Sequence, residues 1–476
     1  MTSDQIRALG PALSSYLDEF ADCFKVGETR LHLKDYVKGQ LSDLPRKSVE
    51  PMAVLADVPP RTLQEFLSLS DWDHERLRSR VQQLVARDHA DSNAIGIVDE
   101  SGHPKKGDKT ACVQRQYCGT TGKIDNCVMT VHLAYAGSDN TFRTLIDSDL
   151  FLPESWDTDL GKRKSAEVPA DVHYRPKYQI ALEQLRRARS NGVHFGWVTA
   201  DEWYGGKGPF IAALEEMGQK FVLEVPRNRL GWLHRPTLGP RGGVPPRDVH
   251  GSTLEDLCRH SRLITGQKWK RLHIKDTQKG PMVWEVKNAL WWTERDGQMA
   301  GPYRLLVARD VLDRSETKYF LSGEVEADLR VLAHVAFSRW PVERCLEDQK
   351  SELGLSHFEC RKYPAVLRHL LLTQVSHLFL ARQCQRLRGK KKDRQSARDD
   401  LPGPHGRLRV ARGDLAPRPD PSAQSRTCSR IDSAHTDPQR RSNPLTHQGQ
   451  TAEAAGNWHP RRAPTVMCSA VTTLAL

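Results

Sequence analysis

The chain has 476 residues, 38% of them hydrophobic, and a formal net charge of +12 at pH 7. This length exceeds what a single hydrophobic core usually organises, so we expect two or three domains. The sequence contains no run of about 18 apolar residues, no secretory signal and no Cys-x-x-Cys pair. It therefore argues against a membrane protein, a secreted disulfide scaffold and a closed zinc site.

Residues 1–90 are predicted to form a helical domain. Apolar residues recur at helical spacing over 6–24 and again over 61–86, where a Ser-Asp-Trp-Asp break divides two short helices. The second of these helices carries three arginines, Arg76, Arg78 and Arg80. Two interpretations stay open: a helix-turn-helix-like DNA-binding unit, or a packing module whose basic residues lie on a solvated face.

The first acidic candidate follows an apolar run. That run ends in Asp99 before a series of turn residues, which predicts a buried strand that presents Asp99 at its end. Strands expected at 112–118 and 126–135 would complete a three-stranded antiparallel meander. The basic loop between the first two strands offers Lys105 and Lys106 for phosphate contact, although lysines in a polar loop are often only solvated.

The second acidic candidate has the same pattern. An apolar run ends in Asp201 and is followed by a glycine break, with helices expected at 177–189 and 209–217 and a strand at 221–225. An acid at this position can also cap the next helix. The alternation of strands and helices predicts a mixed α/β sheet flanked by helices.

Residues 227–313 interrupt this alternation and are predicted to form a β-rich insertion. Strand-like runs recur within the segment, at 268–274, 283–293 and 303–308. Its tryptophans, which alternate with Lys and Arg, are Trp284, Trp291 and Trp292. Aromatic residues of this kind can stack on an unpaired base, but core packing is the favoured interpretation.

The third acid lies on a predicted helix that begins near Pro341 and ends at Gly354. At about 100° per residue, one stripe of this helix carries Arg339, Glu343 and Lys350. A surface pattern of salt bridges between residues four apart explains this stripe equally well when it is considered alone.

The three acids together suggest a metal site. Asp99, Asp201 and Glu343 supply hard oxygen ligands of the kind that Mg²⁺ takes, and Mn²⁺ would be a substitute. Two such ions, roughly 4 Å apart, activate a hydroxyl nucleophile and stabilise the leaving oxygen of a phosphodiester.

After a strongly apolar helix expected at 369–380, the composition changes near Arg386. Most of the formal positive charge lies in residues 386–476, where Pro, Arg, Ser, Gln and His dominate without periodicity. Such a composition predicts a disordered basic tail. It fits either a flexible segment that assists DNA binding or the frameshifted end of a decayed reading frame.

Three motifs give the chain a resemblance to a known family. Arg339, Glu343 and Lys350 match the Arg-x3-Glu-x6-Lys part of a Tyr-x2-Arg-x3-Glu-x6-Lys signature, whose tyrosine falls at Ala336. Two further segments are similar, Leu-Pro-Arg-Lys-Ser-Val-Glu-Pro-Met at 44–52 and Leu-Ser-His-Phe-Glu-Cys-Arg at 355–361. Over roughly residues 10–385 the chain resembles DDE transposases of bacterial insertion sequences.

The resemblance implies an RNase H-like catalytic domain, here 91–226 and 314–385, with Asp99, Asp201 and Glu343 as its metal-binding triad. It also implies that Arg339 and Lys350 contact phosphates at the ends of the mobile element. The expected partners are double-stranded DNA, as terminal inverted repeats and target, and a second copy of the chain. The expected location is the bacterial cytoplasm, in association with the nucleoid.

The expected activity is cleavage of the ends of an insertion sequence and their joining to target DNA. Two alternatives remain from the sequence. One is a catalytically impaired transposase derivative that acts as a DNA-binding repressor, and the other is an RNase H-like repair nuclease.

Overall fold

A computed structural model describes residues 3–139, 141–237, 251–277 and 280–399. The first 389 residues belong to one compact unit, and a second unit begins at Lys390. The last helix, α16, extends from Tyr363 to Asp399, so its helical structure continues past the boundary predicted at Arg386. The rest of the predicted tail, from residue 400 onward, lies outside the described residues.

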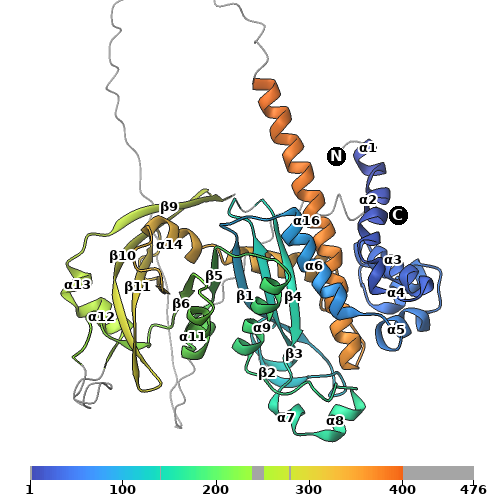
Figure 1. Ribbon diagram of the computed structural model, residues 1–476, viewed down its shortest axis with the longest axis horizontal. Helices are drawn as coiled ribbons and strands as arrows, with labels where there is room; N and C mark the ends of the chain where they lie inside the picture. Colours follow the sequence, from blue (N-terminus) through green and yellow to red (C-terminus); the bar gives the residue numbers. More distant parts are fainter. Residues whose placement is uncertain (1–2, 140, 238–250, 278–279, 400–476) are drawn as a thin grey trace, which may run out of the picture. The chain divides into compact units, whose positions relative to one another are not determined.

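A mixed sheet of ten strands forms the centre of the compact unit (Figure 1). Strand β1 is parallel to β5, and β5 is parallel to β6, whereas the other pairings of the sheet are antiparallel. The predicted α/β class with a mixed sheet flanked by helices is confirmed. The strands are β1 (Ile95–Pro104), β2 (Gln114–Cys118), β3 (Lys123–Ala136), β4 (Arg143–Leu150), β5 (Trp197–Ala200), β6 (Phe221–Glu224), β9 (Lys270–Thr277), β10 (Gly280–Arg295), β11 (Gln298–Asp310) and β12 (Thr317–Ser322).

The predicted meander is wrong in its strand order. Strand β3 lies between β1 and β2, and it also pairs with β4, a strand that the sequence analysis did not predict. The physical reason is length, because β1 continues past Asp99 to Pro104 and β3 is long enough to pair with all of it. Strand β2 closes only a short hairpin on the far side of β3.

The β-rich segment extends the same sheet. Strand β12 pairs with β6 on one side and β11 on the other, so β11, β10 and β9 continue the sheet outward. A separate two-stranded sheet is formed by β7 (Leu230–Gly231) and β8 (Ser252–Thr253). Trp284 and Trp291 are 6% and 0% exposed, and Phe337 stacks on Trp284 with ring centroids 4.3 Å apart. Both tryptophans therefore belong to the core.

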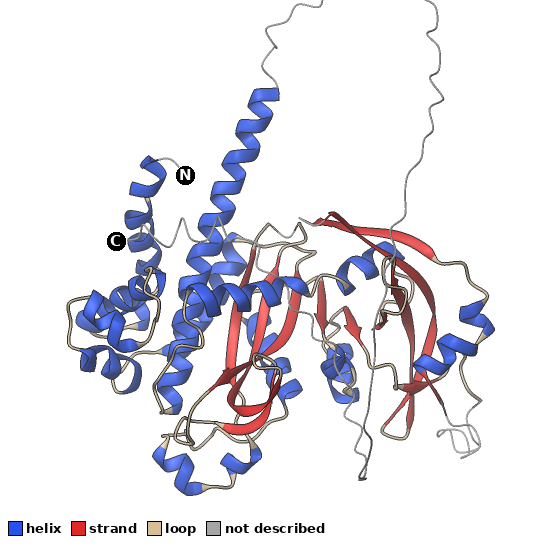
Figure 2. Ribbon diagram, turned by 180° about the vertical axis from the view of Figure 1, so that it is seen from behind, coloured by secondary structure: helices blue, strands red, loops and turns tan. Residues whose placement is uncertain are grey.

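Successive side chains of β4 point to opposite faces of the sheet, so this strand shows which helices cover each face. Asp147 and Asp149 face α6 (His74–Asp88) and α9 (Lys177–Ser190). Ser148 instead accepts a hydrogen bond from Gln374 of α16. Helix α15 (Trp340–Glu352) packs on β1, β3 and β4, and Figure 2 shows helices crossing the sheet on the side turned away in Figure 1.

The amino-terminal helices pack on α16. The Tyr16 hydroxyl donates to the Val375 carbonyl at 2.8 Å, and Gln40 Nε2 donates to Thr373 Oγ1 at 2.8 Å. Helices α3 and α4 lie within the predicted helical domain, between the two stretches whose helical spacing was identified, and α3 buries Leu33, Tyr36 and Val37 at helical spacing. The helices of this region are α1 (Ser3–Arg7), α2 (Leu9–Asp18), α3 (Gly27–Leu41), α4 (Val49–Leu55) and α5 (Pro60–Ser68).

The three arginines of α6 contact acidic side chains of the protein itself. Arg78 is buried and contacts Asp149 at 2.9 Å, while Arg76 and Arg80 both contact Asp22. These contacts favour the packing interpretation of α6. The remaining helices are η1 (Ala21–Cys23), α7 (Glu154–Asp157), α8 (Leu160–Ser165), α10 (Glu202–Gly205), α11 (Gly208–Glu216), α12 (Leu254–His260), α13 (Arg262–Thr265) and α14 (Leu329–Ala336).

Among the described helices, none combines the length and the apolar character that a membrane span requires.

Candidate active site

Two of the three candidate acids lie side by side on neighbouring strands. The prediction that Asp99 ends its strand is wrong, because β1 continues to Pro104 through its pairing with β3. Val98 of β1 is paired with Ala200 of β5, and the next residues along the two parallel strands are Asp99 and Asp201. Strand β5 ends there, and Asp201 begins α10 by accepting hydrogen bonds from the backbone N–H groups of Trp203 and Tyr204. Both interpretations of Asp201 thus fit the structure, because its Oδ1 caps the helix while Oδ2 remains available to a ligand.

The third acid, Glu343, lies on α15, and Arg339 at the start of this helix links it to Asp99. The Arg339 guanidinium lies 3.3 Å from Asp99 Oδ2 and 2.7 Å from Glu343 Oε1. The Glu343 side chain is 55% exposed, so it points away from the apolar side of α15. The Arg339 guanidinium therefore bridges Asp99 and Glu343, which are 244 residues apart in the sequence.

The carboxyl groups of Asp201 and Glu343 both act electrostatically on Asp99. Burial raises the pKa of Asp99 to about 7, Arg339 opposes that rise, and the carboxylates of Asp201 and Glu343 add to it. Burial also raises the pKa of Asp201. A divalent cation would offset the negative charge of these groups, and the donors are the carboxylate oxygens that Mg²⁺ prefers. The residue types therefore fit such an ion.

The present geometry is not that of a closed metal cage. Within the described part of the chain, no group of three His, Cys, Asp or Glu side chains is close enough to hold a metal ion. Arg339 instead bridges Asp99 and Glu343. A cation shared by all three acids would require that bridge to open.

The candidate DNA-binding lysines have different surroundings. Lys350 donates to Thr120 Oγ1 at 2.9 Å, in the turn between β2 and β3. Lys105 donates to the carbonyls of Ser356 and Phe358, and its Nζ lies 3.3 Å from the Phe358 ring centre. Lys106 is exposed. Of the two loop lysines, Lys106 is therefore the one directed toward solvent.

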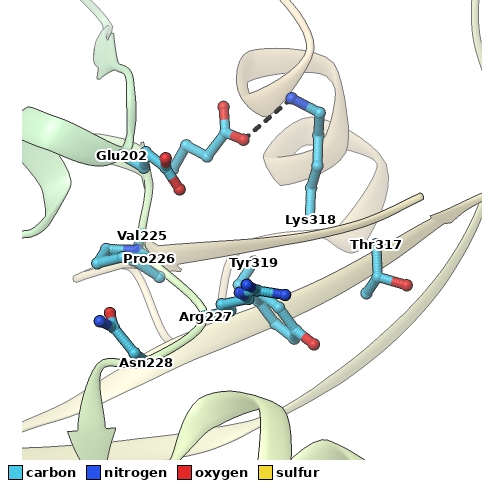
Figure 3. A pocket seen from close by; sticks show the side chains of 9 residues that line it. Glu202, Val225, Pro226, Arg227, Asn228, Thr317, Lys318 and Tyr319 are labelled. Atoms are coloured by element: carbon cyan, nitrogen blue, oxygen red, sulfur yellow. Dashed lines mark hydrogen bonds and ion pairs between the residues drawn. The ribbon is translucent and has the colours of Figure 1, made fainter. Parts of the chain in front are cut away.

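A pocket of about 240 Å³ is lined in part by Glu202, the residue that follows Asp201 in the sequence (Figure 3). Its lining includes Glu202, Asn228, Tyr319 and the ion pair between Glu224 and Lys318, which measures 3.0 Å. The Glu224 carboxylate contributes to the raised pKa of Asp201. No sequence pattern distinguished Glu224, because its neighbours along β6 are ordinary strand residues.

A chain of buried polar groups lies next to Asp99 and was also missed. His132 is the cross-strand partner of Asp99, and its two ring nitrogens bond to Thr130 and Ser148, each at 2.6 Å. The Thr130 hydroxyl also contacts His103 at 2.9 Å. The alternation of these residues along β1, β3 and β4 is apparent only once the strand pairing is known.

The fold and the site together define a class: a mixed sheet of the RNase H-like type that carries acidic residues where the parallel pairing of β1 with β5 ends. A family model described as DDE superfamily endonuclease matches residues 19–281, which is more than half of the chain and includes Asp99 and Asp201. The chain belongs to this family of DDE endonucleases.

A curated relative supports the same assignment. The chain is 26% identical over 330 residues to a probable transposase for insertion sequence element IS701 from Microchaete diplosiphon. The aligned region covers 69% of this chain and 76% of that protein. The predicted resemblance to DDE transposases of insertion sequences is confirmed.

Proposed function

We propose that the protein is the transposase of an insertion sequence, which cleaves the ends of the element and joins them to target DNA. The observation that supports this proposal is that Asp99 and Asp201 follow the paired residues Val98 and Ala200 of neighbouring strands, while Arg339 joins Asp99 to Glu343. The proposed substrates are the terminal inverted repeats and a target duplex, and two copies of the chain would hold the two ends.

The proposed cofactor is Mg²⁺, as two ions, or Mn²⁺ in its place. Asp99, Asp201 and Glu343 would hold the metal, which would supply charge stabilisation at the scissile phosphodiester and a more acidic water or 3′-hydroxyl. The residues of the chain would contribute position rather than covalent chemistry.

Arg339 is proposed to exchange partners when DNA is bound. Its guanidinium now contacts two carboxylates, and the same planar fork binds phosphate oxygens in two parallel hydrogen bonds. A phosphate bound beside Asp99 would therefore compete with Asp99 and Glu343 for the Arg339 guanidinium. Lys350, seven residues after Glu343 on α15, would contact a neighbouring phosphate.

One observation favours the second candidate, a DNA-binding derivative without cleavage that represses the element. The position of the signature tyrosine is Ala336, which is 5% exposed at the end of α14. The following residue does not replace the tyrosine, because Phe337 packs on Trp284 and Phe320. Binding of the ends without metal-dependent nicking would decide for this candidate.

The test is end cleavage by the purified Asp201→Asn protein in the presence of Mg²⁺. Asparagine keeps a helix-capping oxygen but removes the charge, so the fold should be retained while cleavage falls by at least ~10²-fold. Glu216→Gln is the matched control, because Glu216 is an exposed acid on α11. Cleavage by Asp201→Asn at the rate of the control would remove Asp201 from the site.

A further inference from the structure

The hairpin of β2 and β3 exposes an apolar pair near its tip. Tyr117 and Ile124 are directly opposite each other across the two strands, and they are 61% and 60% exposed. On the other side of the hairpin Cys118 is buried and Gln116 and Asp125 are half-buried, so the face of Tyr117 and Ile124 is the more open one. An aromatic residue paired with an aliphatic one on an open strand face is a contact surface that lacks its partner.

The charge beside this pair is positive. Arg115 lies two residues before Tyr117, so it projects from the same face of β2, and it is exposed. The hairpin acid, Asp125, is opposite Gln116 and therefore faces the other side. The open face thus combines apolar surface with a cation, which complements a polyanion better than an apolar protein surface.

The tip of the hairpin is joined to the candidate active site. Thr120 in the turn accepts a hydrogen bond from Lys350 at 2.9 Å and donates one to the Gly102 carbonyl at 2.7 Å. Gly102 lies on β1 three residues after Asp99, and Lys350 lies on the same helix as Glu343. The turn is therefore held against β1 and α15, the elements that carry Asp99 and Glu343.

We propose that Arg115, Tyr117, Thr120 and Ile124, the hairpin surface, form a docking site for double-stranded DNA next to the cleaved bond. The proposal rests on the proposed function, since it names the part of the protein that holds the duplex beside the three acids. Tyr117 and Ile124 would cover the sugar edges of a minor groove, and Arg115 would contact a phosphate.

Binding to the hairpin surface is tested without catalysis. The full chain is titrated in EDTA into a fluorescein-labelled duplex taken from the end of the element, and anisotropy is followed at several salt concentrations. The double variant Tyr117→Ser, Ile124→Ser should weaken binding about 5- to 20-fold with an unchanged salt dependence. Arg115→Gln should lower the slope of log K against log salt by about one.

Leu160→Ser is the matched control, because Leu160 on α8 is 77% exposed and lies outside the hairpin. Unchanged affinity of the double variant, or an equal loss in Leu160→Ser, would overturn the proposal. So would a double variant that loses self-association in sedimentation without DNA, since the occupant would then be a second copy of the chain.

A second comparison tests the link to Lys350. Thr120→Val removes the hydroxyl at nearly constant shape, and Thr120→Ser restores it, while Thr121→Val changes the neighbouring residue of the same turn. Thr120→Val should lower the cleavage rate at saturating DNA several-fold, with recovery in Thr120→Ser and no loss in Thr121→Val. Equal rates for all three variants would contradict the link.

The two proposals fail separately. If Asp201→Asn retains cleavage while the hairpin variants lose duplex binding, only the catalytic assignment is wrong. If Asp201→Asn is inactive and the hairpin variants bind normally, only the docking surface is wrong.

Discussion

Arg339 shows at the scale of a residue how one side chain determines what the site can do. Its guanidinium contacts Asp99 and Glu343 at once, so it offsets the repulsion between these two acids. The spacing of Arg339, Glu343 and Lys350 on one helical stripe was readable from the sequence. The contact with Asp99 was not, because it depends on how α15 lies across β1.

A second cluster of charges, whose acidic partners were not identified from the sequence, is predicted to stabilise the fold. Buried Arg78 contacts Asp147 and Asp149, so Arg78→Met would leave two buried carboxylates with Arg187 as their remaining cation. We expect a loss of about 3–5 kcal/mol in the free energy of unfolding, measured by urea denaturation. Arg76→Met, at a more exposed pair with Asp22, should cost less than ~1 kcal/mol. Equal losses of unfolding free energy in Arg78→Met and Arg76→Met would contradict a stabilising role for the buried cluster.

His377 is predicted to make stability depend on pH. Burial lowers its pKa to about 3, with Arg143 contributing, and its Nδ1 contacts the Thr144 hydroxyl at 3.0 Å. Because the unfolded state takes up this proton below about 6.5, the stabilisation is fully present above that pH and is lost as the pH falls.

The measurement is urea unfolding of the wild type and His377→Gln at several pH values. Between about pH 6 and 4, the wild type should lose about 1.4 kcal/mol per pH unit more than the variant. Parallel pH dependence of the two proteins would show that His377 is not held neutral by the fold.

At the scale of the element, the local sequence pattern predicted the strands and helices whose ends are set by their own residues. The apolar runs before Asp99 and Asp201 and the proline and glycine around α15 predicted β1, β5 and α15. The local pattern could not predict which strands pair, because the neighbour of β1 depends on the lengths of both β2 and β3. Strand β4 was missed because three consecutive buried residues in its second half, Asp147, Ser148 and Asp149, are polar and interrupt the apolar run.

Helix α10, which Asp201 caps, is predicted to depend on Gly205. A Cβ on Gly205 would lie 1.9 Å from the Glu224 carbonyl oxygen, so Gly205→Ala must push α10 away from β6. We expect a loss of about 1–3 kcal/mol in thermal or urea unfolding, together with reduced cleavage. Gly10→Ala is the contrasting case, because nothing lies within 4 Å of a Cβ there and it should stabilise α2 by about 0.5–1 kcal/mol. Similar effects of the two substitutions would contradict this account of α10.

At the scale of the whole molecule, one sheet brings distant segments together. Asp99 and Asp201 are 102 residues apart and meet because β1 and β5 are parallel neighbours. The predicted insertion does not interrupt the sheet, because β12 returns the chain to β6, and α14 and then α15 follow. The sequence predicted the type of sheet and proposed three acids as a site, but the adjacency of Asp99 and Asp201 depends on the order of the strands.

The most direct test of the central claim is a crystal structure of the protein bound to an element-end duplex with Mn²⁺, examined by anomalous scattering. The account predicts an anomalous peak within about 2.0–2.6 Å of the carboxylates of Asp99 and Asp201, with Glu343 beside it and Arg339 on a phosphate. A bound duplex with no peak at these acids, and with Arg339 still joining Asp99 to Glu343, would contradict it.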